Sequence, residues 1–306
     1  MHKEINLQLQ MINMKKIVLS IAFIATGIVA FAQPKIVDKA IVKAKTEITF
    51  PENFSFGGPG GGPGGGDGPP GGFTMPRDME TSTTMTYHPN FMKVESLSDF
   101  GNNVVIVDRM NKKTTTLIEA MGRKTGWFTS DAEAEAQAKR QDSTRKARRD
   151  SLAELGLNFN DNKPELIYSD ETKKVSGFTC KKVTIKSKGP NGQVSENVIW
   201  YNPDFKLSET STAQSAGGGG FGGGGRGRMS MMSAGVPGLD QINGFPMEYE
   251  SVRDNGFKIH MIVTKVQIDA PIDEKTFEIP KGFDVKPQST FEGQGGMRMI
   301  FRSGGN

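Results

Sequence analysis

Cysteine is nearly absent from this sequence, which holds Cys180 alone among 306 residues. A single cysteine excludes an intramolecular disulfide, so the fold must be stabilised by its packed core. It also excludes the paired-cysteine motifs of redox centres and zinc sites. Because Cys180 and Phe178 share a face of an expected strand, we interpret Cys180 as a small buried hydrophobic residue rather than a reactive thiol.

Histidine is also scarce, with three residues in the chain. Of these, His88 and His260 lie beyond the N-terminal segment, and neither belongs to a zinc-protease or nucleophile-elbow motif. We interpret His260 as a residue on the face of a strand. The sequence therefore predicts no catalytic residue and no cofactor, and we expect a protein that is not an enzyme.

An excess of charge of either sign is missing as well. The 38 basic and 34 acidic residues give a net charge of +4, and residues 1–32 account for three of the lysines and one of the glutamates. The remaining chain is nearly neutral, which is not typical of nucleic-acid binding. A basic run at residues 145–149 has two interpretations: contact with anionic lipid at an envelope surface, or a solvated helix face balanced by Asp142 and Asp150.

The N-terminal segment has the features of an export signal. A lysine pair at residues 15–16 precedes an apolar stretch at 17–31, which closes with a small-x-small tripeptide at 30–32. The stretch is short for a bilayer span and lacks a charged stop, which favours a signal peptide at residues 1–32 over the alternative of a single membrane anchor. We predict cleavage before Gln33, export to the periplasm, the outer membrane or beyond, and no transmembrane span in the mature protein.

Two glycine-rich tracts interrupt the mature sequence, at residues 57–72 and within 215–235. Glycine has no side chain to bury and loses the most entropy on ordering, so we predict disordered loops that form no site. Neither tract has the Lys-Ser/Thr ending of a phosphate-binding loop. We therefore expect a single β domain at residues 33–287 with these two insertions, followed by a flexible tail at 288–306.

Outside these tracts, apolar and polar residues alternate with the period of two that is typical of strands with one buried face. In the last long segment, Phe257, Ile259, Met261 and Val263 share one face, while His260 lies on the other. Turn residues separate the segments at short intervals, as in an antiparallel meander. The expected strands are residues 42–50, 85–87, 91–97, 104–108, 114–120, 126–129, 165–168, 179–187, 194–201, 247–253 and 257–268.

One helix is expected within this meander, at residues 131–155. Ser130 and Glu133 form a capping box, and Gly156 follows the last turn. The helix consists mostly of alanine and charged residues, so we expect it to lie largely in solvent. The fold class that these patterns predict is mainly β, with a curved antiparallel sheet and few helices.

Four segments of the chain, taken in order, resemble a group of exported families. They are residues 172–182 (TKKVSGFTCKK), 198–201 (VIWY), 244–248 (GFPME) and 273–283 (DEKTFEIPKGF). The resemblance is to uncharacterised exported proteins of Gram-negative bacteria, including the GLPGLI-type family, which share the LolA/LolB-like lipoprotein-carrier fold. It implies an open half barrel whose concave side is apolar. In the lipoprotein carriers, that cavity shelters acyl chains.

We therefore expect a non-enzymatic exported protein that binds a lipid, another apolar ligand or a lipidated partner on the concave face of its sheet. The alternative is an envelope structural or interaction protein without a ligand, in which the protein's own side chains close the sheet. Tryptophan suits an apolar ligand, although core packing uses the same residue. The expected ligand-lining residues are Met92, Val94, Ile106, Leu117, Trp127, Trp200, Ile259 and Met261.

A further alternative concerns methionine. Met229, Met231 and Met232 follow the second glycine tract, and thioether sulfur is a ligand that Cu(I) prefers. This cluster would make the protein a copper-handling one. Methionine is also the usual adaptable filler of apolar surfaces, and no other set of metal ligands is predicted.

Overall fold

The chain divides into two units, residues 1–33 and 34–306, and the computed structural model describes most of the second. The described residues are 33–51, 77–120, 122–154, 163–188, 194–208, 236, 238–252 and 256–292. The expected signal peptide, both glycine-rich tracts and residues 293–306 of the expected tail lie outside them. Within these ranges, no helix has both the length and the apolar character that crossing a bilayer requires.

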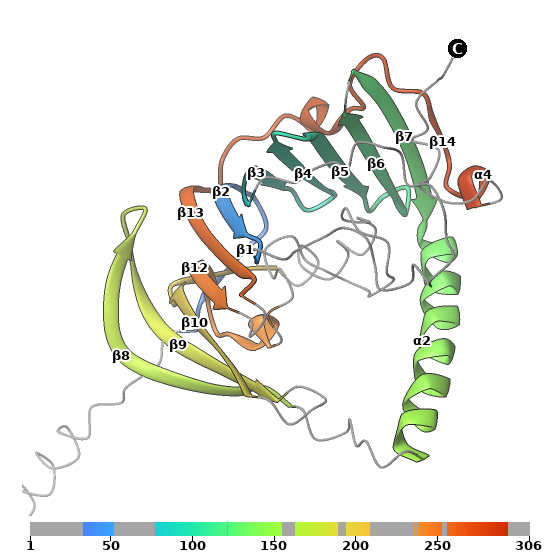
Figure 1. The fold of residues 1–306 in the computed structure, drawn as a ribbon. Coiled ribbons are helices and arrows are strands. Elements are labelled where there is room, and N and C mark those ends of the chain that lie inside the picture. Colours follow the sequence, from blue (N-terminus) through green and yellow to red (C-terminus); the bar gives the residue numbers. More distant parts are fainter. Residues whose placement is uncertain are drawn as a thin grey trace, which may run out of the picture. The chain divides into compact units, whose positions relative to one another are not determined.

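Twelve strands form one continuous sheet (Figure 1). Their order across the sheet is β14-β7-β6-β5-β4-β3-β2-β13-β12-β10-β9-β8. Strands β14 and β8 are its two edges, so the sheet does not close. All neighbouring pairs are antiparallel except β14 with β7. The prediction of a mainly β chain with an open antiparallel sheet is confirmed.

The N-terminal half of the sheet is a meander, in which each strand pairs with the next strand of the chain. All six strands that the alternation predicts in this region are present. They are β2 (Ala40–Thr49), β3 (Asp78–Tyr87), β4 (Phe91–Ser98), β5 (Gly101–Asp108), β6 (Lys113–Ala120) and β7 (Arg123–Ser130).

The C-terminal half continues the sheet with the five strands expected there. Ser176 and Gly177 connect the first two of them, and their φ angles of 50° and 86° are those of a type I′ hairpin turn. The strands are β8 (Glu165–Val175), β9 (Phe178–Lys188), β10 (Val194–Asn202), β12 (Phe245–Val252) and β13 (Lys258–Ile268).

Several short elements were not predicted, because three or four residues are too few to show a period. Strands β1 (Lys35–Val37) and β11 (Phe205–Leu207) pair in parallel as a separate two-stranded sheet. The others are η1 (Leu239–Gln241), η2 (Glu274–Phe277), β14 (Val285–Pro287) and α4 (Ser289–Glu292).

Strands β2 and β13 join the two halves of the sheet. They are paired from Ala40 opposite Ile268 to Thr49 opposite Lys258, with a register shift between Val263 and Lys265. Because β13 follows β12 in the chain and β2 precedes β3, this one pairing converts two meanders into a single sheet.

Side chains alternate between the two faces of this sheet. We call the face that carries Val42, Met85 and Val94, which lie opposite one another on β2, β3 and β4, the first face. Buried residues of this face form the larger of two apolar clusters, the first core. Strands β1 and β11 and the turn η1 contribute to it the residues Val37, Phe205, Leu207, Leu239 and Ile242.

The opposite face, which we call the second face, holds a smaller apolar cluster, the second core. It consists of Val104, Ile106 and Leu117 from β5 and β6, together with Phe277 of η2. The chain after β13 therefore packs on the second face, while the first core packs on the other. Strand β5 is covered on both faces, because all four of its residues from Val104 to Val107 are at most 4% exposed.

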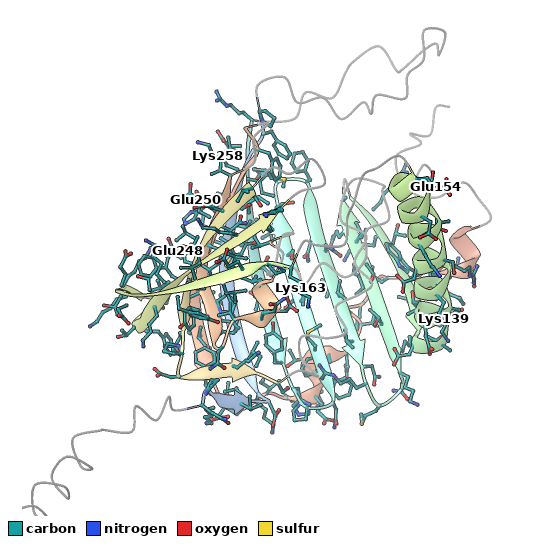
Figure 2. All side chains as sticks on the ribbon, turned by 90° about the horizontal axis from the view of Figure 1, so that it is seen from below. Lys139, Glu154, Lys163, Glu248, Glu250 and Lys258 are labelled. Carbon is teal, nitrogen blue, oxygen red and sulfur yellow. The ribbon has the colours of Figure 1, made fainter. Side chains whose placement is uncertain are left out.

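The one long helix, α2 (Asp131–Glu154), begins directly after β7. The Glu133 carboxylate accepts hydrogen bonds of 2.9 Å from the backbone N–H and the hydroxyl of Ser130, so the predicted capping box is confirmed. From Ala132 onward, every described side chain of the helix is exposed, as expected. Lys139 and Glu154, the last residue of the helix, are labelled in Figure 2.

Phe277→Ala tests whether the second core holds the chain after β13 on the sheet. Phe277 is 6% exposed, and its ring stacks on Phe91 with centroids 5.0 Å apart. Loss of a buried phenylalanine ring typically costs about 3–5 kcal/mol, and urea denaturation should show the free energy of unfolding lowered by that amount. The control, Ile279→Ala at an exposed position, should change it by less than about 0.5 kcal/mol. Equal losses in the two variants would contradict this packing.

Candidate functional site

Six of the eight expected ligand-lining residues are packed inside the protein. Four of them lie on the first face, belong to the first core and are at most 5% exposed: Met92, Val94, Ile259 and Met261. Two lie on the second face and belong to the second core, Ile106 at 4% and Leu117 at 0% exposure. The structure therefore divides these six residues between the two faces of the sheet.

The two expected tryptophans lie on opposite faces as well. Trp127 is a half-buried residue on the first face of β7, opposite Thr116 of β6. Trp200 is a half-buried residue on the second face of β10, opposite Glu248 of β12. The Nζ atom of Lys173 lies 5.2 Å from the centroid of the Trp200 ring, a cation–π contact. The two rings therefore face different surroundings and do not line a common surface.

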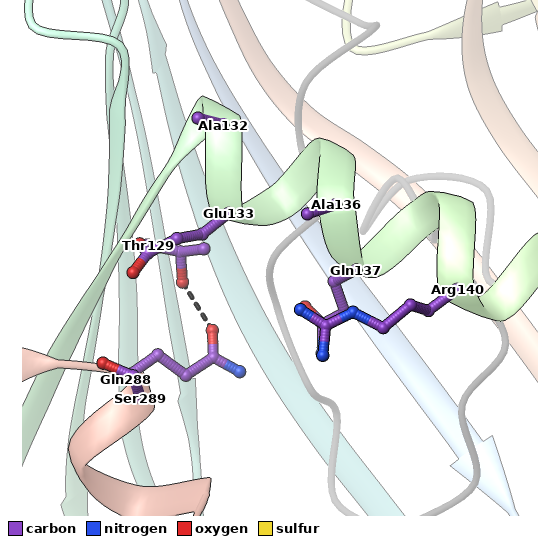
Figure 3. A pocket seen from close by; sticks show the side chains of 8 residues that line it. All are labelled: Thr129, Ala132, Glu133, Ala136, Gln137, Arg140, Gln288 and Ser289. Atoms are coloured by element: carbon purple, nitrogen blue, oxygen red, sulfur yellow. Dashed lines mark hydrogen bonds between the residues drawn. The ribbon is translucent and has the colours of Figure 1, made fainter.

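A groove of about 410 Å³ lies between the first turns of α2 and the segment where β14 meets α4 (Figure 3). At one end of it, the Thr129 hydroxyl donates a hydrogen bond of 2.5 Å to the Gln288 side-chain carbonyl. The sequence did not indicate this groove, because its two sides are far apart in the chain. The lining residues are Thr129, Ala132, Glu133, Ala136, Gln137, Arg140, Gln288 and Ser289.

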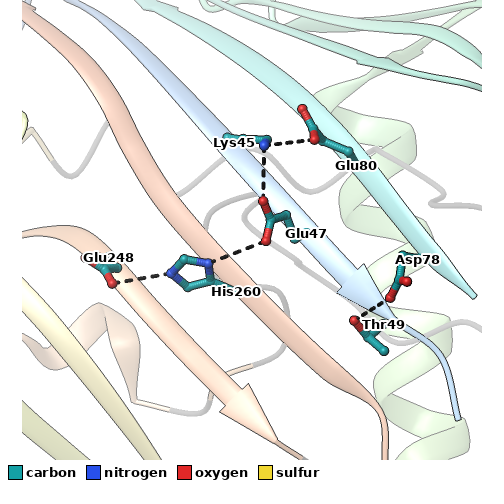
Figure 4. Close-up of polar contacts among 7 residues, drawn as sticks. All are labelled: Lys45, Glu47, Thr49, Asp78, Glu80, Glu248 and His260. Carbon is teal, nitrogen blue, oxygen red and sulfur yellow. Dashed lines mark hydrogen bonds and ion pairs between the residues drawn. The ribbon is translucent and has the colours of Figure 1, made fainter.

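A row of charged side chains crosses the second face from β3 to β12 (Figure 4). The Lys45 ammonium lies 2.8 Å from Glu80 and 3.1 Å from Glu47. Next in the row is His260, whose Nδ1 is 3.9 Å from Glu47 and whose Nε2 is 3.3 Å from Glu248. Lys45 of β2 thus forms an ion pair with Glu80 of the neighbouring strand β3, which stabilises the pairing of these strands, although Glu47 and Glu80 lie directly opposite each other.

Glu248 is the most enclosed carboxylate of this row, with a side chain that is 14% exposed. Its Oε1 atom faces His260, and its Oε2 atom lies 2.6 Å from the Nζ of Lys173. Enclosing a charge is costly unless the charge is paired, and both oxygens of Glu248 have a basic neighbour. The same lysine covers the Trp200 ring, so one side chain joins the charged row to the aromatic residue.

The ionised forms of Lys45 and Glu47 are stabilised by their neighbours. The hydrogen bonds that Lys45 donates to Glu80 and to Glu47 raise the pKa of Lys45, and the one that Glu47 accepts lowers the pKa of Glu47. Both shifts move the pKa away from neutrality. General acid–base catalysis requires the opposite, a pKa near the working pH.

The other histidine beyond the N-terminal segment, His88, lies in the turn between β3 and β4 and is 8% exposed. Its Nδ1 accepts a hydrogen bond of 3.3 Å from the backbone N–H of Asn90. Its ring lies 5.9 Å from the rings of Phe91 and Phe277. His88 therefore contributes to packing beside the second core, and His260 lies on a strand face as the sequence indicated.

Cys180 is completely buried within β9, as expected for a small hydrophobic residue. Burial raises the pKa of its thiol from 9.0 to about 11. The thiol, rather than the nucleophilic thiolate, is therefore the form present at neutral pH.

Metal ligation has little support in the described part of the chain, where no three His, Cys, Asp or Glu side chains gather in a way that could hold an ion. The methionines proposed for Cu(I), Met229, Met231 and Met232, lie outside the described residues. The copper hypothesis stays a prediction.

Comparison with known proteins adds no family. No family model and no curated protein sequence match this chain. Two crystal forms of PNGF-II, in space groups C2 and P21, align with 83% of this chain at 13% identity and a TM-score of 0.32. The alignments cover 32% and 33% of those chains, so this chain spans about a third of their length. At this TM-score the likeness carries no argument about function.

Thiol labelling tests the burial of Cys180. A rise of the pKa from 9.0 to about 11 lowers the thiolate fraction at pH 8 by about a hundredfold, so native protein should react with Ellman's reagent at least that much more slowly than protein unfolded in urea. The Cys180→Ser variant gives the background rate. Stoichiometric labelling of the native protein at the unfolded rate would contradict the assignment of Cys180 to the core.

Proposed function

We propose that this is a non-enzymatic exported protein of the envelope that acts through contacts of its surface and holds no ligand in its sheet. The observation that carries the proposal is the burial of the residues expected to line a cavity. Met92, Val94, Ile259 and Met261 contact other apolar residues of the chain, and Ile106 and Leu117 do so on the opposite face.

The elements that cover the two cores also support this proposal. On the first face, β1, β11 and η1 supply buried side chains such as Val37, Phe205 and Leu239. On the second face, Phe277 fills the same role over β5 and β6. Apolar surface that is buried by the chain itself stabilises the fold and is not available to a lipid.

The surface that remains on the second face carries many charged side chains, together with exposed apolar residues such as Leu97, Ile167 and Val252. Its acidic and basic side chains are largely paired, as in Lys173 with Glu248, Lys182 with Glu171 and Lys186 with Glu196. Such a surface suits contacts with other proteins or with the polar part of the envelope. Export rests on the N-terminal sequence pattern, which lies outside the described residues.

A second candidate is the binding of an apolar ligand or a lipidated partner, as the resemblance to lipoprotein carriers implies. The observation that favours it is the end of the first face near β7. Ile118 and Trp127 lie there on neighbouring strands and are only half-buried. A lipid held there would contact Trp127. It would not contact Trp200, which lies on the other face of the sheet.

Native mass spectrometry distinguishes the two candidates. Protein purified from the periplasm without detergent should have the mass of a chain that begins at Gln33, carry no apolar adduct and take up no added palmitate. A stoichiometric fatty acid or phospholipid, identified after solvent extraction, would overturn the ligand-free proposal.

Two matched variants would then locate such a ligand. Because Trp127 and Trp200 lie on opposite faces, Trp127→Ala should abolish an adduct bound on the first face, and Trp200→Ala should leave it unchanged. The converse result would place the ligand on the second face.

A further inference from the structure

The residues that the structure describes in the lining of the groove beside α2 offer more hydrogen-bond donors than acceptors. The Gln288 carbonyl oxygen already accepts the hydrogen bond from Thr129, which leaves the amide N–H groups of Gln288 as donors. Figure 3 shows this amide nitrogen directed toward the side of the groove where the Arg140 guanidinium lies. The hydroxyl of Ser289 and the amide of Gln137 belong to the same lining.

The acidic residue among the described lining residues, Glu133, has one of its two oxygens, Oε2, occupied by Ser130. The Glu133 carboxylate is held at the start of α2 by the N–H and hydroxyl of Ser130, and these hydrogen bonds lower its pKa. The helix N-terminus is therefore already capped by its own residues. Among the described lining residues, the groups that remain are the Arg140 guanidinium, the amides of Gln137 and Gln288, and the Ser289 hydroxyl.

Arg140 differs from its neighbour Lys139 in that no acidic residue lies one helical turn away from it. Lys139 forms an ion pair of 2.8 Å with Glu135, one helical turn earlier. The positions one turn before and after Arg140 are Ala136 and Thr144, which carry no charge, and none of the described carboxylates lies within ion-pair distance of it. Ala132 and Ala136, which also line the groove, contribute only methyl groups.

We propose that this groove binds a small ligand through a carboxylate group. A planar carboxylate accepts two hydrogen bonds from one guanidinium, and its remaining lone pairs suit the amide of Gln288. The volume of about 410 Å³ is within the range of sites for small molecules, roughly 300–1,000 Å³. This inference is independent of the proposed function, because the groove shares no residue with either core or with the charged row.

Titration with succinate, followed by ¹⁵N NMR spectra of the purified protein, tests the proposal. Amide signals of residues 129–140 and 288–289 should shift in a saturable manner, and addition of salt should weaken the binding. Succinamide has a similar shape but no charge. It should bind at least about tenfold more weakly than succinate, since charge-assisted hydrogen bonds are about twice as strong as neutral ones.

Variants of α2 make the test specific to the groove. Arg140→Gln should weaken succinate binding by about tenfold or more, whereas Lys139→Gln, on the same helix turn but outside the lining, should change it less than about twofold. Ala136→Leu should also abolish binding, because leucine retains the helix propensity and fills the groove. Circular dichroism verifies that each variant is folded.

Three results would overturn the proposal. They are the absence of saturable shifts with succinate, equal binding of succinamide, and equal losses in the Arg140→Gln and Lys139→Gln variants.

Discussion

The antiparallel pairing of β2 with β13 is the contact on which the rest of the structure depends. It brings residues 40–49 against residues 258–268, so it must be formed across most of the length of the chain. On one side of it lies the meander β2 to β7, and on the other lie β13, β12, β10, β9 and β8. Val42, Ala44, Met261 and Val263 of these two strands are all buried in the first core. Without this pairing, neither half could complete that core.

The same pairing determines how the apolar residues are used. The first core lies on one face of the joined sheet and is covered by β1, β11 and η1, while the second core lies on the other face and is covered by the chain that follows β13. Each face therefore has its own apolar core, and the two cores lie over different sets of strands. A single concave apolar surface, as in a carrier, would need the apolar residues of all strands to share one face. This division favours a protein whose apolar residues serve its own stability.

The sequence predicted the strands well but not the faces. Alternation within a strand is a local property, so segments such as 91–97 and 257–268 could be located from their own residues. Which face a residue shares with residues of another strand depends on the register between the strands, and the bulge between Trp200 and Tyr201 changes that register. Ile106 and Val94 were expected together, but Val94 lies opposite Val105, which places Ile106 on the other face.

One sequence feature does point to the second core. The uninterrupted apolar run from Val104 to Val107 is typical of a strand that is buried on both faces, and β5 is such a strand. By contrast, the groove beside α2 has no local pattern. Arg140 and Gln288 line the same groove because β14 pairs with β7, the strand that leads into the helix.

Hydrogen exchange of native protein, read by mass spectrometry of peptides, tests the central role of the β2–β13 pairing most directly. If this pairing holds the sheet together, the amides of residues 40–49 and 258–268 should be the slowest to exchange and should exchange together, with a free energy of opening equal to that of global unfolding. Exchange of either strand at a rate well above that of its own meander would contradict the account, because the two halves would then be stable without the contact that joins them.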